Sequence, residues 1–150
     1  MNDPDQKVPE ESLRQSQSRF QCLADSLPIC LLQKDADGRP TFANQAYLKF
    51  HGLTLEQVLN RNSSGLFPQS DVERFRLSDL DVVRSGEESH ETCRFVTTDG
   101  RERWLERIKG PMRDADGAIV GIQILFWDVT ERRQRENSHN HERSLLHTLL

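Results

Sequence analysis

The chain has 150 residues, a formal net charge of -4 and a pI near 5.7. This length suits one domain of about 100–120 residues with tails. The net negative charge argues against nucleic-acid binding through clustered Lys and Arg side chains. No apolar run approaches the roughly 18 residues of a membrane span, and the polar N-terminus does not resemble a secretory signal.

The first predicted elements are a helix and a hairpin. Apolar residues at three-and-four spacing predict a short amphipathic helix over Ser18–Leu27, which Pro28 ends. The polar residues 1–17 before it are expected to be disordered or to extend the helix. Strands over 29–34 and 40–43 flank Asp-Ala-Asp-Gly, a turn whose Asp and Gly tolerate the backbone of a tight hairpin.

Several short helices are predicted in the middle of the chain. Asn44 is placed to cap the first of them, since an Asn side chain can accept a helix N–H. Capping boxes are predicted at the next two helix starts, one formed by Thr54 with Gln57 and the other by Ser70 with Glu73.

The pattern then changes from helix to strand. The last middle helix is predicted over 71–84, and strands follow over 91–97, 103–109 and 119–129. Consecutive strands joined by short turns favour an antiparallel sheet. The predicted fold is therefore α+β, with a five-stranded antiparallel sheet, several short helices on one face, and a helix at each end.

Three segments carry a resemblance to a known family. They are ADSLPICLLQKDADGRPTFANQAYLKFHGLTLEQVLNR, TTDGRERWLERIKGPMRDADGAIVGIQILFWDVTERRQ and, within the second, the triad Asp128-Val129-Thr130. In order and spacing they resemble the PAS fold with its PAC segment, over residues 18–133. The resemblance implies a cytoplasmic sensory module, not an enzyme, joined covalently to an output domain such as a histidine kinase or a cyclic-dinucleotide enzyme.

The tail, residues 134–150, is predicted to be a linker helix. Its last residues resemble the start of the domain, with Leu146 matching Phe20 and Leu149 matching Leu23. Two interpretations stay open: the tail begins a second PAS domain, or it is only the end of a linker or coiled-coil helix.

The resemblance also implies a ligand pocket beneath the helices. Because strand side chains alternate between faces, the register places one set inside: Cys93, Phe95, Leu105, Arg107, Ile122, Ile124 and Phe126. Arg107 with Lys109 in an apolar cavity suits a small anionic ligand, since a buried cation needs a partner. Alternatively, the two side chains lie at the cavity mouth, extend to water, or bind Glu73 or Glu56.

The other face of the sheet carries an apolar patch that is large for a bare surface. Its residues are Trp104, Ile108, Leu125 and Trp127. We expect the first helix, through Phe20, Leu23 and Leu27, a second subunit, or both to cover it, which favours a homodimer.

Cofactors remain unassigned by the sequence. Ser63 stands where flavin-binding members of the family carry their photoreactive Cys, and Phe126 stands where they carry a Gln, so flavin photochemistry is disfavoured. The helix over 71–84 lacks the proximal His of haem-binding members, although His90 follows it. No metal site is predicted, because His139 and His141 lack supporting ligands.

Two further features concern compartment and signalling. The three cysteines have neither disulfide nor zinc spacing, which favours reduced thiols in the cytoplasm. Asp128 and Thr130 stand where the last strand becomes the exit helix, and each can bond neighbouring backbone there. We expect them to transmit a signal, either from a ligand in the pocket or, in a ligand-free dimerisation module, from changes made elsewhere.

Overall fold

The computed structural model describes residues 4–60, 67–97 and 99–149. Its strands form one antiparallel sheet in the order β2-β1-β5-β4-β3, which confirms the predicted fold class. The strands are β1 (Cys30–Asp35), β2 (Pro40–Ala43), β3 (Ser89–Val96), β4 (Glu102–Arg113) and β5 (Ile119–Asp128). The helices are α1 (Pro4–Ser26), α2 (Gln45–His51), α3 (Leu55–Asn60), α4 (Gln69–Ser85) and α5 (Thr130–Leu149).

The two Asp-Ala-Asp-Gly turns have the same construction. In the β1–β2 turn, the Asp35 carboxylate accepts the backbone N–H groups of Asp37 and Arg39, and Gly38 adopts φ 86°. A positive φ is a conformation that glycine adopts without steric cost. Asp114 accepts N–H groups in the same way at the β4–β5 turn, so the repeated motif is explained by hairpin formation.

Asn44 joins four parts of the chain and is 0% exposed. Its Oδ1 accepts the N–H groups of Leu31 and Tyr47, and its Nδ2 donates to the carbonyls of Ala24 and Ile29. The predicted cap of α2 is confirmed, and the same side chain also ties the end of α1 to the sheet.

One predicted capping box is confirmed and the other is wrong. Thr54 and Gln57 exchange side-chain and backbone hydrogen bonds at the start of α3. At α4 the cap position is Pro68, which makes no side-chain cap bond, and Ser70 lies inside the helix. Glu73 instead pairs with Arg76, 2.8 Å away on the same helix, because an i,i+3 partner is available there.

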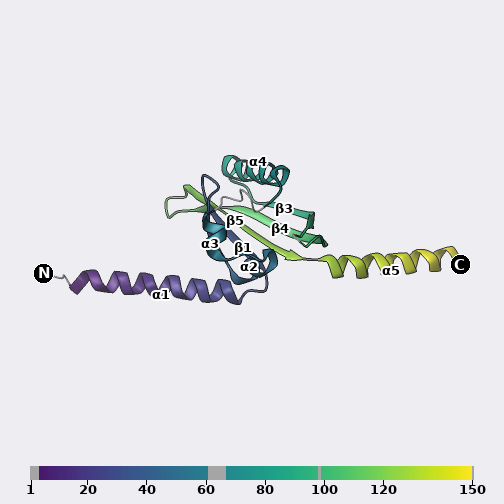
Figure 1. Cartoon of the computed structure of the whole chain (residues 1–150), viewed down its shortest axis with the longest axis horizontal. Helices are drawn as coiled ribbons and strands as arrows, with labels where there is room; N and C mark the ends of the chain where they lie inside the picture. The colour runs from purple at the N-terminus through teal and green to yellow at the C-terminus, as the bar shows by residue number, and fades with distance from the viewer. Residues whose placement is uncertain (1–3, 61–66, 98, 150) are drawn as a thin grey trace.

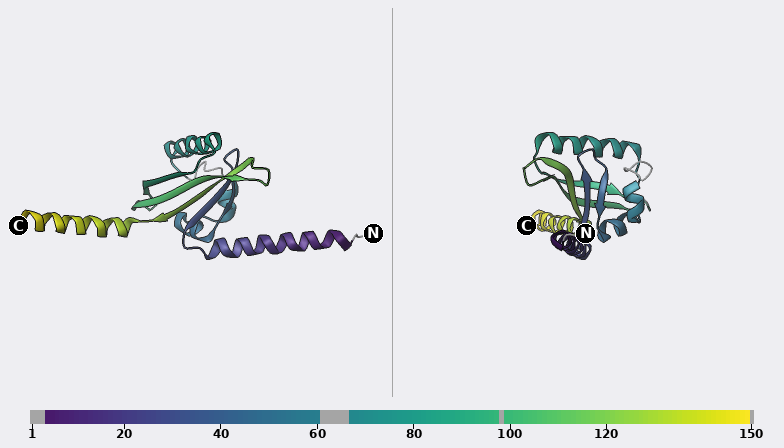
Figure 2. Two further views of the ribbon diagram at one scale, coloured as in Figure 1. Left: turned by 180° about the vertical axis from the view of Figure 1, so that it is seen from behind. Right: turned by 90° about the vertical axis from the view of Figure 1, so that its left-hand side faces the viewer.

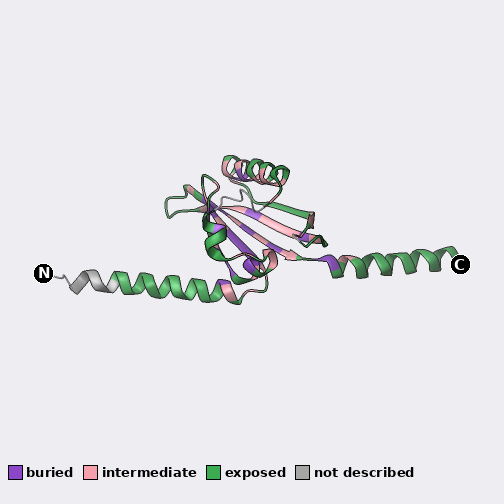
Figure 3. Ribbon diagram, in the orientation of Figure 1, coloured by how far each residue is buried: buried purple, intermediate pink, exposed green. Residues whose placement is uncertain are grey.

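The helices lie on both sides of the sheet. Figure 1 and the right-hand view of Figure 2 show α4 over one face, with α1 and α5 beyond the opposite face. The buried residues concentrate on the sheet and α2 (Figure 3), whereas α1 and α5 are largely exposed and point in opposite directions. The fold thus places the core under α2, α3 and α4.

The first helix is longer than its apolar pattern predicts. It begins at Pro4 instead of Ser18, and among residues 9–26, whose side chains the structure describes, Ala24 near the C-terminal end is buried while most of the others are exposed. The preceding residues are rich in Glu, Gln and Arg, which have good helix propensity without needing burial. The apolar spacing therefore marks the anchored end of the helix and not its full length.

Candidate functional site: a cavity beside the exit junction

A cavity of about 250 Å³ lies between α4, α2 and the inner face of the sheet. Its wall includes six of the predicted pocket residues: Cys93, Phe95, Leu105, Arg107, Ile124 and Phe126. The seventh, Ile122, is 0% exposed and belongs to the packed core. Whether these side chains bind a ligand stays a prediction.

One end of the cavity is aromatic and surrounds His51. The imidazole lies 4.6 Å from the Tyr47 ring, 5.1 Å from Phe67, 5.6 Å from Phe95 and 5.9 Å from Phe126, between ring centroids. Burial among these rings lowers the pKa of His51 to about 4, since desolvation disfavours the charged imidazolium. At neutral pH the His51 imidazole is therefore uncharged.

The other end is a buried ion triad that joins α4 to two strands. The Asp79 carboxylate lies 2.8 Å from the Lys34 ammonium of β1 and 2.6 Å from the Lys109 ammonium of β4. The side chains of Lys34, Lys109 and Asp79 are only 5%, 2% and 8% exposed. Burial lowers the pKa of Lys109 to about 8, although Asp79 opposes this effect.

Sequence reasoning missed Lys34 and Asp79, although a signal for Asp79 exists. Val72, Phe75, Asp79 and Val82 follow the three-and-four spacing of a helix face, so Asp79 occupies a core position of α4. A carboxylate in an apolar stripe predicts a buried cationic partner. Which cation meets it depends on how the helix packs on the sheet.

Arg107 faces inward as predicted, but it has a different partner from those considered. Its guanidinium pairs with Glu91, its neighbour on β3, and lies 6.0 Å from the centre of the Phe75 ring. The alternative in which Glu73 or Glu56 binds Arg107 and Lys109 is wrong. Arg107 pairs with Glu91 and Lys109 pairs with Asp79, whereas the side chains of Glu73 and Glu56 are exposed.

The junction between β5 and α5 is held by a small hydrogen-bond network. The Thr130 hydroxyl accepts the Trp104 N–H at 2.9 Å, and the Asp128 carboxylate accepts the Thr130 N–H at 2.8 Å. The Val129 N–H donates to the Trp104 carbonyl. Val129 and Thr130 thus connect the start of α5 to β4, and the Asp128 carboxylate also lies 3.6 Å from the Arg103 guanidinium of β4. The role of Asp128 and Thr130 in signalling stays a prediction.

The outer-face patch is only partly covered within the chain. Trp104, Ile108, Leu125 and Trp127 are half-buried, and the Arg133 guanidinium of α5 stacks 4.0 Å from the Trp104 ring centre. On α1, Phe20 contacts Phe42 of β2 and Leu23 is 62% exposed, and Leu27, just after the end of α1, is half-buried. Covering by a second subunit stays a prediction.

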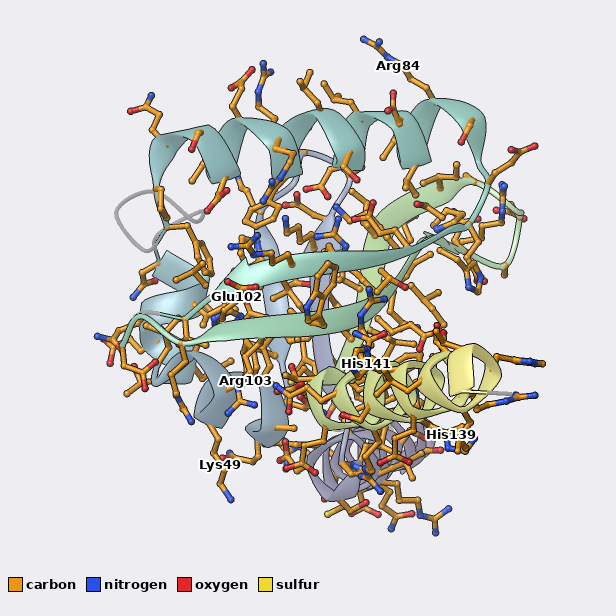
Figure 4. The ribbon with its side chains drawn as sticks, turned by 90° about the vertical axis from the view of Figure 1, so that its right-hand side faces the viewer. Lys49, Arg84, Glu102, Arg103, His139 and His141 are labelled. Carbon is orange, nitrogen blue, oxygen red and sulfur yellow. The ribbon has the colours of Figure 1, made fainter. Side chains whose placement is uncertain are left out.

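The remaining sequence hypotheses concern cofactors and membranes. Residues 61–66, which include Ser63 at the position of the photoreactive Cys, lie outside the described residues. Figure 4 shows His139 and His141 on α5, and no group of three potential metal ligands occurs in the described part of the chain. Within residues 4–60, 67–97 and 99–149, no helix combines the length and apolar character that crossing a membrane requires.

Curated relatives of the chain include proteins named as sensors. Biofilm dispersion protein BdlA of Pseudomonas aeruginosa is 31% identical over 63% of this chain and 23% of its own length. The C4-dicarboxylate transport sensor DctS of Rhodobacter capsulatus is 26% identical over 85% of this chain and 20% of its own. The chain spans between 11% and 23% of the length of its curated relatives.

Solved structures and a family model agree with the observed fold. The PAS domain of Bordetella pertussis BvgS has a TM-score of 0.70 at 24% identity, covering 87% of this chain and 98% of that one. VqmA bound to DPO has a TM-score of 0.65 at 25% identity, covering 73% of this chain and 56% of that one. A family model described as the PAS fold matches residues 24–134, and the chain therefore belongs to the PAS family.

Proposed function

We propose that the chain is a cytoplasmic sensory module in which a small molecule in the cavity biases the junction between β5 and α5. One observation carries the proposal: the cavity wall and the junction are built on the same pair of strands. Leu105 and Phe126 line the cavity, Leu105 pairs with Asp128 in the ladder, and adjacent Trp104 bonds Thr130. A shift of β4 or β5 at the cavity would move the start of α5.

The size of the cavity and the relatives support this function. At about 250 Å³ the cavity lies just below the usual range of about 300–1,000 Å³ for ligand pockets, which favours a metabolite over a haem or a flavin. One solved structure that resembles the chain is that of VqmA bound to DPO. The sensor names of the relatives support an output domain, such as a histidine kinase, further along the full protein.

Native mass spectrometry of protein purified without added ligand tests the proposed function. We expect a mass increment that appears in the native spectrum and disappears on denaturation, from a small molecule retained in the cavity. A clean ligand-free spectrum, together with no binding in a metabolite screen, would contradict the sensor function.

A ligand-free dimerisation and relay module is the second candidate. Apolar side chains exposed on α1, including Leu13 at 59% and Leu23 at 62%, and the half-buried Trp127 on the sheet favour a second copy of the chain as partner. A ligand-free dimer in the native spectrum would support this candidate.

Asp128→Ala in the full-length parent protein is expected to change the signal output about fivefold or more, the low end of typical coupling effects. The substitution removes the carboxylate that accepts the Thr130 N–H at the first turn of α5. Output should be measured with and without stimulus, and the fold checked by circular dichroism. Asp116→Ala, in the exposed β4–β5 turn, is the matched control. Equal output from both variants would contradict a transmitting role for Asp128.

A further inference from the structure

The charges at the buried end of the cavity do not balance. Asp79 is the single carboxylate that the described residues place against two ammonium groups, those of Lys34 and Lys109. The neighbouring cations have their own partners, since Arg107 pairs with Glu91 and Arg74 pairs with Asp71. The triad therefore carries one surplus positive charge in a site where its side chains are at least nine-tenths buried.

The two lysines also have unused hydrogen-bond donors. Each ammonium carries three N–H groups, and in the described part of the chain each makes one hydrogen bond, to Asp79. Both lysines line the cavity. Burying a cation with unused N–H donors costs free energy unless another hydrogen-bond acceptor binds them. The cavity gives such an acceptor access to both lysines.

At the opposite end, around His51, the cavity wall is mainly aromatic. Phe67, Phe95 and Phe126 surround His51, whose burial keeps it neutral. The three arginines that line the rest of the cavity already pair with carboxylates: Arg74 with Asp71, Arg94 with Glu102 and Arg107 with Glu91. Among the described residues, a second negative charge on the ligand would therefore meet no unpaired cation outside the triad. The volume of about 250 Å³ equals roughly eight waters of liquid, room for on the order of ten non-hydrogen atoms.

We propose that the cavity binds a small organic monocarboxylate, with its carboxylate on Lys34 and Lys109 and its apolar body among the rings around His51. One negative charge on the ligand neutralises the surplus positive charge of the triad. A dicarboxylate or a phosphate dianion would bring one negative charge more than the triad can neutralise. The ligand carboxylate would accept N–H groups of Lys34 and Lys109 that Asp79 leaves unused, and would so become part of the contact between α4 and the sheet. This inference rests on the proposed sensory function and assigns its ligand class.

Calorimetric titration of the 150-residue chain with 3-phenylpropionate and with 3-phenylpropanamide tests the ligand class. The two probes have nearly the same shape and differ in charge. We expect the carboxylate to bind at least tenfold more tightly at pH 7, because a charge-assisted bond to a buried ammonium is stronger than a neutral one. Succinate should bind at least tenfold more weakly than 3-phenylpropionate.

Lys109→Met is expected to remove most of this preference. The variant keeps the Lys34–Asp79 ion pair, whose net charge is zero. Its fold can be checked by circular dichroism. Its affinity for 3-phenylpropionate should fall at least tenfold, with little change for the amide. Lys49→Met is the matched control, because Lys49 is exposed on α2 and points away from the domain in Figure 4.

The outcomes separate this inference from the proposed function. If amide and carboxylate bind equally, or Lys109→Met binds both as the unaltered chain does, the monocarboxylate assignment is overturned while a ligand-binding cavity stands. If neither probe binds, the assignment is also overturned, and the native mass spectrum then decides whether the cavity holds any ligand.

Discussion

Asp79→Ala is expected to lower the free energy of unfolding by about 3–5 kcal/mol, the usual cost of removing one partner of a buried ion pair. The substitution leaves the ammonium groups of Lys34 and Lys109 facing each other without a carboxylate. Two buried like charges without a counterion carry a large electrostatic penalty, and urea unfolding at pH 7 measures it.

Asp81→Ala provides the matched control for this change. Asp81 lies two residues further along α4 and is exposed, so its removal should change stability by about 0.5 kcal/mol or less. Adding Lys109→Met to Asp79→Ala should recover part of the loss, since one unpaired ammonium disappears. A loss of less than about 1 kcal/mol in Asp79→Ala would show that the triad does not hold α4 to the sheet.

Acidification is expected to destabilise the chain through His51 by about 2–3 kcal/mol between pH 7.5 and 4.5. In the folded chain the pKa of His51 is lowered to about 4 from its ordinary 6.5. Between these two values the unfolded chain binds a proton that the folded chain does not. The contribution of His51 is thus fully present above pH 6.5 and is lost as the pH falls toward 4.

His51→Phe isolates this contribution from the carboxylates that titrate in the same range. The new ring would pack in the same aromatic cluster but cannot take up a proton. The free energy of unfolding of the two proteins should therefore differ by about 2–3 kcal/mol more at pH 4.5 than at pH 7.5, by urea unfolding. Parallel pH profiles would contradict a neutral His51 desolvated in the aromatic cluster.

Local signals in the sequence predicted most of the secondary structure. The Asp and Gly of the hairpin turns, the Asn44 cap and the Thr54–Gln57 box act over a few residues, and the structure confirms them. The Ser70–Glu73 capping box did not form, because the motif is compatible with a cap but does not require one. The helix begins after Pro68 instead, and Glu73 pairs with Arg76.

The sequence by itself determined the α+β fold and the inward-facing residues of the last strands, because turn chemistry and strand alternation are local properties. Only the tertiary structure decided the ion triad, since Lys34 and Lys109 lie 45 and 30 residues from Asp79 along the chain. Which buried cation meets which carboxylate depends on how α4 packs across β1 and β4. That packing is fixed by contacts distant in sequence, and it is what gives the cavity one charged end and one aromatic end.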